Sequence, residues 1–175
     1  MNIAQELSVQ SYCFREFTDN AQVAQMIRDC GMSHVELFGC GIHGDYEDPA
    51  NFAKTCELYK SLGVTPVALG VPCFSGDEAK ERKYFESAKA AGFRYIGCSF
   101  DITKMPECLR TAEKLSEEFD MFVAIHNHGG QDWLGNATTL EWIFGQTSNR
   151  IGLCLDTAWA MTANEDPQRM AETFV

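Results

Sequence analysis

Two histidines and an aspartate stand where a divalent metal ion could be bound. His126 and His128 are two residues apart in the segment VAIHNHGG, and Asp156 ends the apolar run IGLCLD. Side chains two residues apart on an extended strand project to the same side, and imidazole and carboxylate groups are common ligands of divalent metals. The sequence therefore predicts a divalent-metal site that includes His126 and Asp156. The alternative is structural, because an aspartate after a strand also serves as a helix N-cap.

Several other residues could contact a polyol or a sugar, and most of them follow a predicted strand. Trp133 and Trp159 stand in the loops after the last two strands, where aromatic side chains could wall a sugar ring. Tyr12 and Arg15 follow the first strand in QSYCFREF, where surface packing is an equally good explanation. Glu36 lies within the apolar segment HVELF and would either touch substrate or be a buried carboxylate with its hydrogen bonds satisfied.

Two more side chains belong to neighbouring segments. His43, in the loop GCGIHGDYEDP, is a weaker candidate for the site. Trp142, in the segment LEWIF, is expected on the core face of a helix.

The elements that must position these residues alternate between helix and strand. An amphipathic helix, a glycine and a short apolar strand recur in RDCGMSHVELFG, KSLGVTPVALGV and KAAGFRYIGCSF, and each glycine stands where a helix C-cap needs a positive φ. The predicted strands are residues 5–10, 34–38, 65–70, 95–99, 121–126 and 151–156. Their C-terminal ends are 27 to 32 residues apart, a period typical of successive right-handed βα units around a parallel sheet.

Helix starts carry local signals as well. Asp48-Pro49 and Asp166-Pro167 each predict an N-cap followed by proline at the first helical position, and Ser75 with Glu78 has the spacing of a capping box. No Ser/Gly-rich linker divides the chain, so a single α/β domain is expected. A closed (β/α)₈ barrel typically needs about 250 residues. The alternatives for this chain of 175 residues are an open doubly wound sheet and a barrel that lacks its last two units.

Composition excludes some partners. The chain has 14 basic and 25 acidic residues and a net charge of −11, which argues against nucleic acid as the main partner. No run of about 18 apolar residues could span a membrane, and the first residues do not resemble a signal peptide. The eight cysteines are never closer than ten residues apart, so no CxxC motif occurs, and free thiols in a reducing cytoplasm are expected.

Four segments together resemble a known superfamily. The segments LSVQSYCFREF, HVELFG, VAIHNHGG and GLCLDTAWA follow one another, one per βα unit. In this arrangement the chain is similar to the xylose isomerase-like TIM barrels, the sugar phosphate isomerase/epimerase group. The resemblance favours a TIM (β/α)₈-type barrel over an open sheet, and it implies a divalent metal at the C-terminal mouth of the barrel. Manganese is the first expectation for that metal, and zinc, magnesium, cobalt or iron are the others.

The resemblance also implies roles for individual residues. Asp156 matches the sixth-strand aspartate ligand of the family, and His126 falls where many sugar epimerases have a metal-binding glutamate that also moves a proton. That histidine is a departure from the two-glutamate epimerase mechanism. We therefore expect His126 and Glu36 to be catalytic, and Tyr12, Arg15, His128, Trp133 and Trp159 to contact substrate. The AP endonucleases of the same family have a histidine at the position of Trp159, so a phosphodiesterase is disfavoured.

Three functions follow as hypotheses. The first is a metal-dependent isomerase or epimerase of a sugar or sugar phosphate, working through an enediolate. The second is a dehydratase or lyase of keto-sugars or keto-inositols on the same site, and the third is a non-catalytic, truncated sugar-binding fragment. We expect residues 1–175 to form a C-terminally incomplete barrel domain that belongs to a longer chain or associates into an oligomer through its open strand edges.

Overall fold

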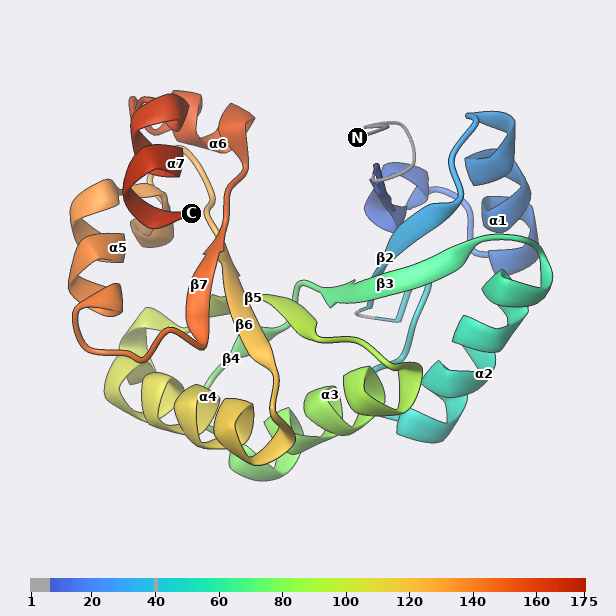
Figure 1. The fold of residues 1–175 in the computed structure, drawn as a ribbon, viewed down its shortest axis with the longest axis horizontal. Helices are drawn as coiled ribbons and strands as arrows, with labels where there is room; N and C mark the ends of the chain where they lie inside the picture. Colours follow the sequence, from blue (N-terminus) through green and yellow to red (C-terminus); the bar gives the residue numbers. More distant parts are fainter. Residues whose placement is uncertain (1–6, 40) are drawn as a thin grey trace. The chain divides into compact units, whose positions relative to one another are not determined.

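The computed structural model describes residues 7–39 and 41–175, which form two compact units. The first unit contains residues up to Gly70 together with Arg82–Arg94. The second unit contains Val71–Glu81 and Tyr95–Val175. Both are α/β structures in which parallel strands alternate along the chain with helices (Figure 1).

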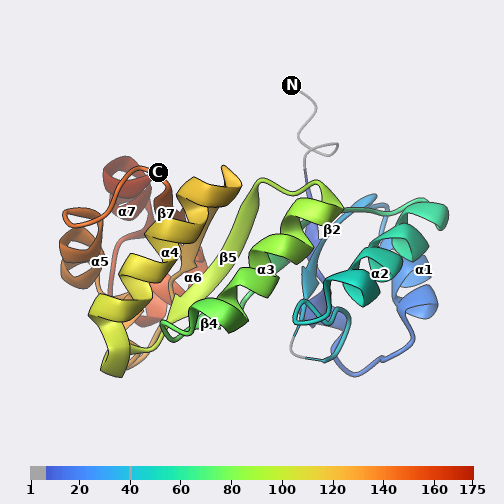
Figure 2. The same cartoon turned by 90° about the horizontal axis from the view of Figure 1, so that it is seen from below.

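The first unit has three parallel strands in the order β1-β2-β3. Its elements are β1 (Val9–Gln10), a 3₁₀ turn (Ser11–Phe14), α1 (Asn20–Asp29), β2 (His34–Phe38), α2 (Pro49–Ser61), β3 (Thr65–Gly70) and most of α3 (Glu78–Ala91). Figure 2 shows α1 and α2 side by side. Along β2, Val35 and Leu37 are fully buried while His34, Glu36 and Phe38 are only half-buried. One face of this strand therefore belongs to the core, and the other carries the polar residues.

The second unit has four parallel strands in the order β4-β5-β6-β7. Its elements are β4 (Cys73–Phe74), β5 (Tyr95–Phe100), a 3₁₀ turn (Ile102–Lys104), α4 (Met105–Phe119), β6 (Phe122–His126), a second 3₁₀ turn (Trp133–Gly135), α5 (Ala137–Phe144), β7 (Ile151–Cys154), α6 (Thr157–Thr162) and α7 (Pro167–Phe174). Val123 and Ile125 of β6 are fully buried, whereas Phe122, Ala124 and His126 are half-buried. His126 therefore ends the strand on the face opposite the core.

The predicted strands agree closely with the observed ones. Residues 34–38 and 65–70 are strands with the predicted bounds, and β5 and β6 differ from prediction by one residue at one end. The strand predicted at 5–10 is observed only at Val9–Gln10, and its residues 5 and 6 lie outside the described part. The last strand ends at Cys154, because Asp156 begins the next helix as its N-cap. The two-residue strand β4 has no counterpart among the predictions.

Local helix signals are confirmed with one exception. Gly31, Gly63 and Gly92 all have positive φ, between 76° and 82°. Asp48 and Asp166 cap α2 and α7 as predicted. The capping box predicted at Ser75 is wrong, because Asp77 accepts the hydrogen bond from the backbone N–H of Lys80. The Ser75 N–H donates instead to the Glu81 carboxylate.

No disulfide bond links the described cysteines, and several of them act as small apolar groups. Cys56, Cys98 and Cys108 are fully buried or nearly so. Burial raises the pKa of Cys56 and that of Cys108 to about 11, so both thiols are protonated at neutral pH. Cys40 lies outside the described residues. No helix in residues 7–39 and 41–175 is long and apolar enough to cross a membrane.

Trp142 corrects a prediction about the core. The indole is 53% exposed, although it was expected on the core face of its helix. Leu140 and Ile143 are the buried residues of α5. Because residues two apart on a helix are about 200° apart, Trp142 points away from Leu140.

Glu81 is a fully buried carboxylate in the second unit. Its Oε1 accepts hydrogen bonds from the backbone N–H groups of Ser75 at 2.6 Å and Gly76 at 2.7 Å. Its Oε2 is buried and has no hydrogen-bond partner among the residues that the structure describes. Burial raises the pKa of this carboxyl, although the hydrogen bonds oppose the shift. Folding therefore favours the protonated form, and the stability gained from it is lost as the pH rises through the folded-state pKa.

The expected consequence is a pH-dependent effect of Glu81→Gln. Glutamine cannot ionise, so the melting temperature of the variant should rise relative to wild type as the pH is raised from 4 to 8. Thermal unfolding followed by circular dichroism measures this difference. Glu86→Gln, at an exposed position of the same helix, is the control and should show no such trend. A melting-temperature difference for Glu81→Gln that is constant across the pH range would contradict the prediction.

Candidate functional site

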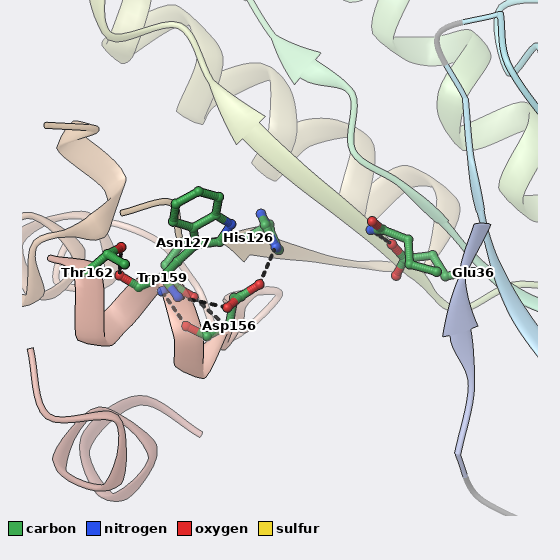
Figure 3. Close-up of polar contacts among 7 residues, drawn as sticks. Glu36, His126, Asn127, Asp156, Trp159 and Thr162 are labelled. Carbon is green, nitrogen blue, oxygen red and sulfur yellow. Dashed lines mark hydrogen bonds and ion pairs between the residues drawn. The ribbon is translucent and has the colours of Figure 1, made fainter. Parts of the chain in front are cut away.

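His126 and Asp156 meet at the carboxyl end of two neighbouring strands. β6 and β7 are parallel, and His126, the last residue of β6, pairs in register with Cys154, the last residue of β7. Asp156 follows two residues later as the N-cap of α6. Its Oδ2 lies 3.5 Å from Nε2 of His126, and the two side chains point toward one another (Figure 3). The side chains are 20% and 33% exposed, so a small ligand can reach both.

The buried Asn127 side chain holds Asp156 in place. Its Oδ1 accepts a hydrogen bond of 2.6 Å from the backbone N–H of Asp156. Its Nδ2 donates one of 3.0 Å to the backbone carbonyl of the same residue. Asn127 is fully buried, and these bonds connect the chain beyond the ends of β6 and β7. The backbone of Asp156 is thereby fixed at both of its polar groups.

The two carboxylate oxygens of Asp156 have different roles. Oδ1 accepts a hydrogen bond of 2.9 Å from the backbone N–H of Trp159, which is the N-cap bond of α6. Oδ2 faces His126. The structural alternative considered for this aspartate is therefore correct for one oxygen, while the other remains available to a ligand.

Aromatic rings lie next to this pair. The His128 ring is 4.0 Å from the Trp159 ring between centroids, with 31° between the planes. The His126 and His128 ring centroids are 6.2 Å apart. A Cβ on Gly129 would lie 2.8 Å from the backbone oxygen of Trp159 and closer still to Thr162. The absence of a side chain at Gly129 is thus what lets α6 approach and bring Trp159 beside His128.

Trp133 lies in the turn whose Gly135 approaches the backbone of His128. It is half-buried in the 3₁₀ turn before α5 and lines an apolar depression with Ile102, Met105 and Trp142. Among the described residues, the Trp133 ring does not contact the rings of His128 and Trp159. Its predicted contact with substrate stays a prediction.

Glu36 belongs to the first unit, where its carboxylate is held between two strands. Gln10 of β1 is its register partner and donates a hydrogen bond of 2.5 Å from Nε2 to Glu36 Oε1. On the other side, a Cβ on Gly70 of β3 would lie 2.5 Å from the same Oε1. Glu36 is half-buried, with one oxygen bonded to Gln10. One oxygen of Glu36 is thus hydrogen-bonded within the protein, and contact of this side chain with substrate stays a prediction.

Tyr12 and Arg15 lie together after β1. The Arg15 guanidinium is 4.8 Å from the centre of the Tyr12 ring, which itself packs 4.7 Å from the Phe38 ring. Tyr12 is 43% exposed. An exposed aromatic ring beside a cation is suited to contact a polar ligand, and the packing against Phe38 also fits the structural alternative.

His43 has a structural role. It is 1% exposed, and its Nε2 donates a hydrogen bond of 2.7 Å to the carbonyl of Phe17. Its Nδ1 lies 3.0 Å from the hydroxyl of Ser11, which also accepts from the backbone N–H of Phe38. Both ring nitrogens of His43 therefore have partners within the protein. His43, a weaker site candidate from the sequence, is thus not available to bind a ligand.

The separation of His126 and Asp156 fits a shared metal ion. A tetrahedral ion with bonds of about 2.0–2.2 Å places two ligand atoms about 3.3–3.6 Å apart, and the observed separation is 3.5 Å. A direct hydrogen bond would be shorter, at about 2.7–3.2 Å. Within residues 7–39 and 41–175, no group of three or more His, Cys, Asp or Glu side chains is arranged to hold a metal. At a metal ion held by this pair, His126 and Asp156 would be two protein ligands, and the other coordination positions would be left to water or substrate.

Solved structures with the same fold identify the architecture. An uncharacterised protein from Parabacteroides distasonis matches with a TM-score of 0.70 and 23% identity over 95% of this chain and 69% of its own. A sugar phosphate isomerase/epimerase from the same organism matches with a TM-score of 0.71 and 12% identity over 95% of this chain and 70% of its own. A xylose isomerase domain-containing protein from Salmonella typhimurium LT2 matches with a TM-score of 0.71 and 14% identity over 98% and 67%.

The chain has the xylose isomerase-like TIM-barrel fold. Other proteins that share this fold with it are the IOLI protein with a bound zinc atom (TM-score 0.65), a Mycobacterium smegmatis protein in complex with magnesium (0.64) and D-psicose 3-epimerase with D-fructose (0.56). The sequence matches no model of a known protein family and no curated protein sequence. The chain spans about two thirds of the xylose isomerase-like proteins that it matches.

Three residues of this fold contribute to the candidate sites without having been predicted from the sequence. Asn127 fixes Asp156, Gln10 holds Glu36, and Gly129 makes room for α6. The signal for Asn127 was its place between His126 and His128, because strand alternation turns it toward the core side. Gln10 ends the first predicted strand, where α/β folds place site residues.

Proposed function

We propose that this chain is part of a metal-dependent sugar isomerase or epimerase. The observation that carries the proposal is the meeting of His126 Nε2 and Asp156 Oδ2 at 3.5 Å, at the carboxyl end of neighbouring parallel strands. In barrels of this kind, active sites are formed at that end of the strands. The neighbours named as a sugar phosphate isomerase/epimerase and as D-psicose 3-epimerase support the reaction class.

His126 and Asp156 are the residues that would hold the metal. We propose manganese first, and the neighbours solved with zinc and with magnesium support a divalent ion more generally. When bound, such an ion would polarise a carbonyl oxygen and the adjacent hydroxyl of the substrate. Asp156 would bind through Oδ2, since Oδ1 caps α6, and Asn127 would keep that oxygen directed toward His126.

The remaining residues would bind the sugar and move its proton. We propose that Glu36 is the base that takes a proton from the carbon next to the carbonyl, with Gln10 fixing its Oε1 so that the other oxygen can act. His126 is the second candidate for proton transfer. The adjacent rings of His128 and Trp159 would offer apolar area and hydrogen-bonding nitrogens to a sugar ring. Tyr12, Arg15 and Trp133 are proposed as further substrate contacts.

Solvent deuterium exchange tests this function. The 175-residue chain is incubated in D₂O with Mn²⁺ and a panel of ketoses and ketose phosphates, and products are analysed by NMR and mass spectrometry. We expect deuterium to enter at the carbon next to the carbonyl, and an isomer or epimer to form without loss of water. The exchange should stop with EDTA and in His126→Ala. A product lighter by one water would support the dehydratase alternative, and a metal-loaded protein that exchanges no substrate of the panel would contradict the proposal.

A further inference from the structure

The Asn127 side chain continues the strand pairing beyond the point where β6 and β7 end. The last register pair of these strands is His126 with Cys154. One residue further on β6, the Asn127 amide bonds both to the N–H and to the C=O of Asp156, at 2.6 Å and 3.0 Å. It thus makes both hydrogen bonds of a backbone partner from a side chain that is 0% exposed.

These two hydrogen bonds require a side chain at position 127 that both donates and accepts, as the asparagine amide does. An amide presents one acceptor and one donor on the same planar group, whereas a carboxylate has only acceptors and an aliphatic side chain has neither. Both backbone groups of Asp156 are fixed by Asn127, and Oδ1 accepts a hydrogen bond from the Trp159 N–H. Among the described residues, Oδ2 accepts no backbone hydrogen bond and faces His126. Its distance from His126 therefore depends on where Asn127 holds the backbone.

We propose that Asn127 is a positioning residue that sets the divalent-metal affinity of the His126–Asp156 pair. The proposal rests on the proposed function in that it takes this pair as the metal site. Partners in the outer shell of a metal site typically change its affinity by about 10–100-fold when they are removed. The asparagine acts through the backbone of the ligand residue, so its side chain needs no contact with the ion.

The test compares Asn127→Leu with wild type in the 175-residue chain. Leucine keeps the γ-branched shape and removes both hydrogen bonds, and Asn127→Ala is a second variant in case the larger apolar group impairs folding. Asn136→Ala is the matched control, because Asn136 also bonds a backbone group through its side chain, at the N-cap of α5. Mn²⁺ affinity is measured by isothermal titration, and amide hydrogen exchange is measured at Trp159, whose N–H bonds to Asp156.

We expect the Asn127 variants to bind Mn²⁺ about 10–100-fold more weakly, with faster exchange at the Trp159 amide. Asn136→Ala should leave both quantities unchanged even where it lowers the melting temperature. Wild-type affinity in a folded Asn127 variant would overturn the proposal. If wild type itself binds no divalent metal, the proposed function fails. Amide exchange tests the positioning role separately, because unchanged exchange at Trp159 in the Asn127 variants would overturn it.

Discussion

Asp156→Ala should remove most of the bound divalent metal. The substitution deletes the one anionic ligand of the His126–Asp156 pair. Because loss of an outer-shell partner already costs about 10–100-fold, loss of a direct ligand should weaken binding by more than about 100-fold. Metal content after dialysis against Mn²⁺, measured by ICP mass spectrometry, checks this expectation.

Asp156 is also an N-cap, so the control must remove a cap without touching the metal site. Asp166→Ala does this, because Asp166 caps α7 by accepting bonds from the N–H groups of Gln168 and Arg169. Each variant should lose about 1 kcal/mol of stability from its cap. Only Asp156→Ala should lose metal. Equal metal content in wild type and Asp156→Ala would reduce Asp156 to its capping role.

Gly129→Ala should destabilise the second unit and disturb the aromatic pair beside the candidate metal site. The added Cβ would lie 1.7 Å from Thr162 Oγ1, 2.7 Å from a ring carbon of Trp159 and 2.8 Å from the Trp159 backbone oxygen. The threonine side chain can rotate away, but a backbone oxygen moves only with its helix. Overpacking of this kind costs about 1–3 kcal/mol, and we expect the upper end because α6 itself must shift. The melting temperature should fall by about 2–4 °C for each kcal/mol lost.

Gly152→Ala provides the comparison for this substitution. Gly152 lies in β7, and a Cβ there would have no atom within 4 Å. The melting temperature of Gly152→Ala should equal that of wild type within error. The melting temperature of Gly129→Ala should fall, and the tryptophan fluorescence of this variant should change. A Gly129→Ala protein as stable as Gly152→Ala would show that α6 does not depend on the close approach at Gly129.

The meeting of His126 with Asp156 could be predicted because it depends on local signals. The strands β6 and β7 were evident from their short apolar runs. Glycines with positive φ marked the helix ends before β2, β3 and β5, whereas the C-caps of α4 and α5 are Asp120 and Gly145, and the φ of Gly145 is negative. Parallel strands with similar periods bring their carboxyl ends to the same edge of the sheet. A residue that ends one such strand and a residue that follows the next strand are therefore expected to be neighbours. This expectation does not require the exact register of the two strands.

Contacts that depend on register or on packing were decided only by the tertiary structure. Gln10 and Glu36 are 26 residues apart, and Asn127 and Asp156 are 29 apart, so their pairing follows from which residues stand opposite one another on adjacent strands. His43 became a structural residue because folding placed Ser11 and the Phe17 carbonyl against its two nitrogens.

The sequence by itself thus determined the alternation of helices and strands, most of their bounds, and the polar residues at the strand ends. The tertiary structure decided which of those residues are fixed by hydrogen bonds, which residues make these bonds, and which side-chain oxygen remains for a ligand. The physical reason is one of range: apolar periodicity, caps and positive-φ glycines act within a few residues of the chain. Hydrogen bonds such as that from Asp156 N–H to Asn127 Oδ1 exist only once two distant strands lie side by side.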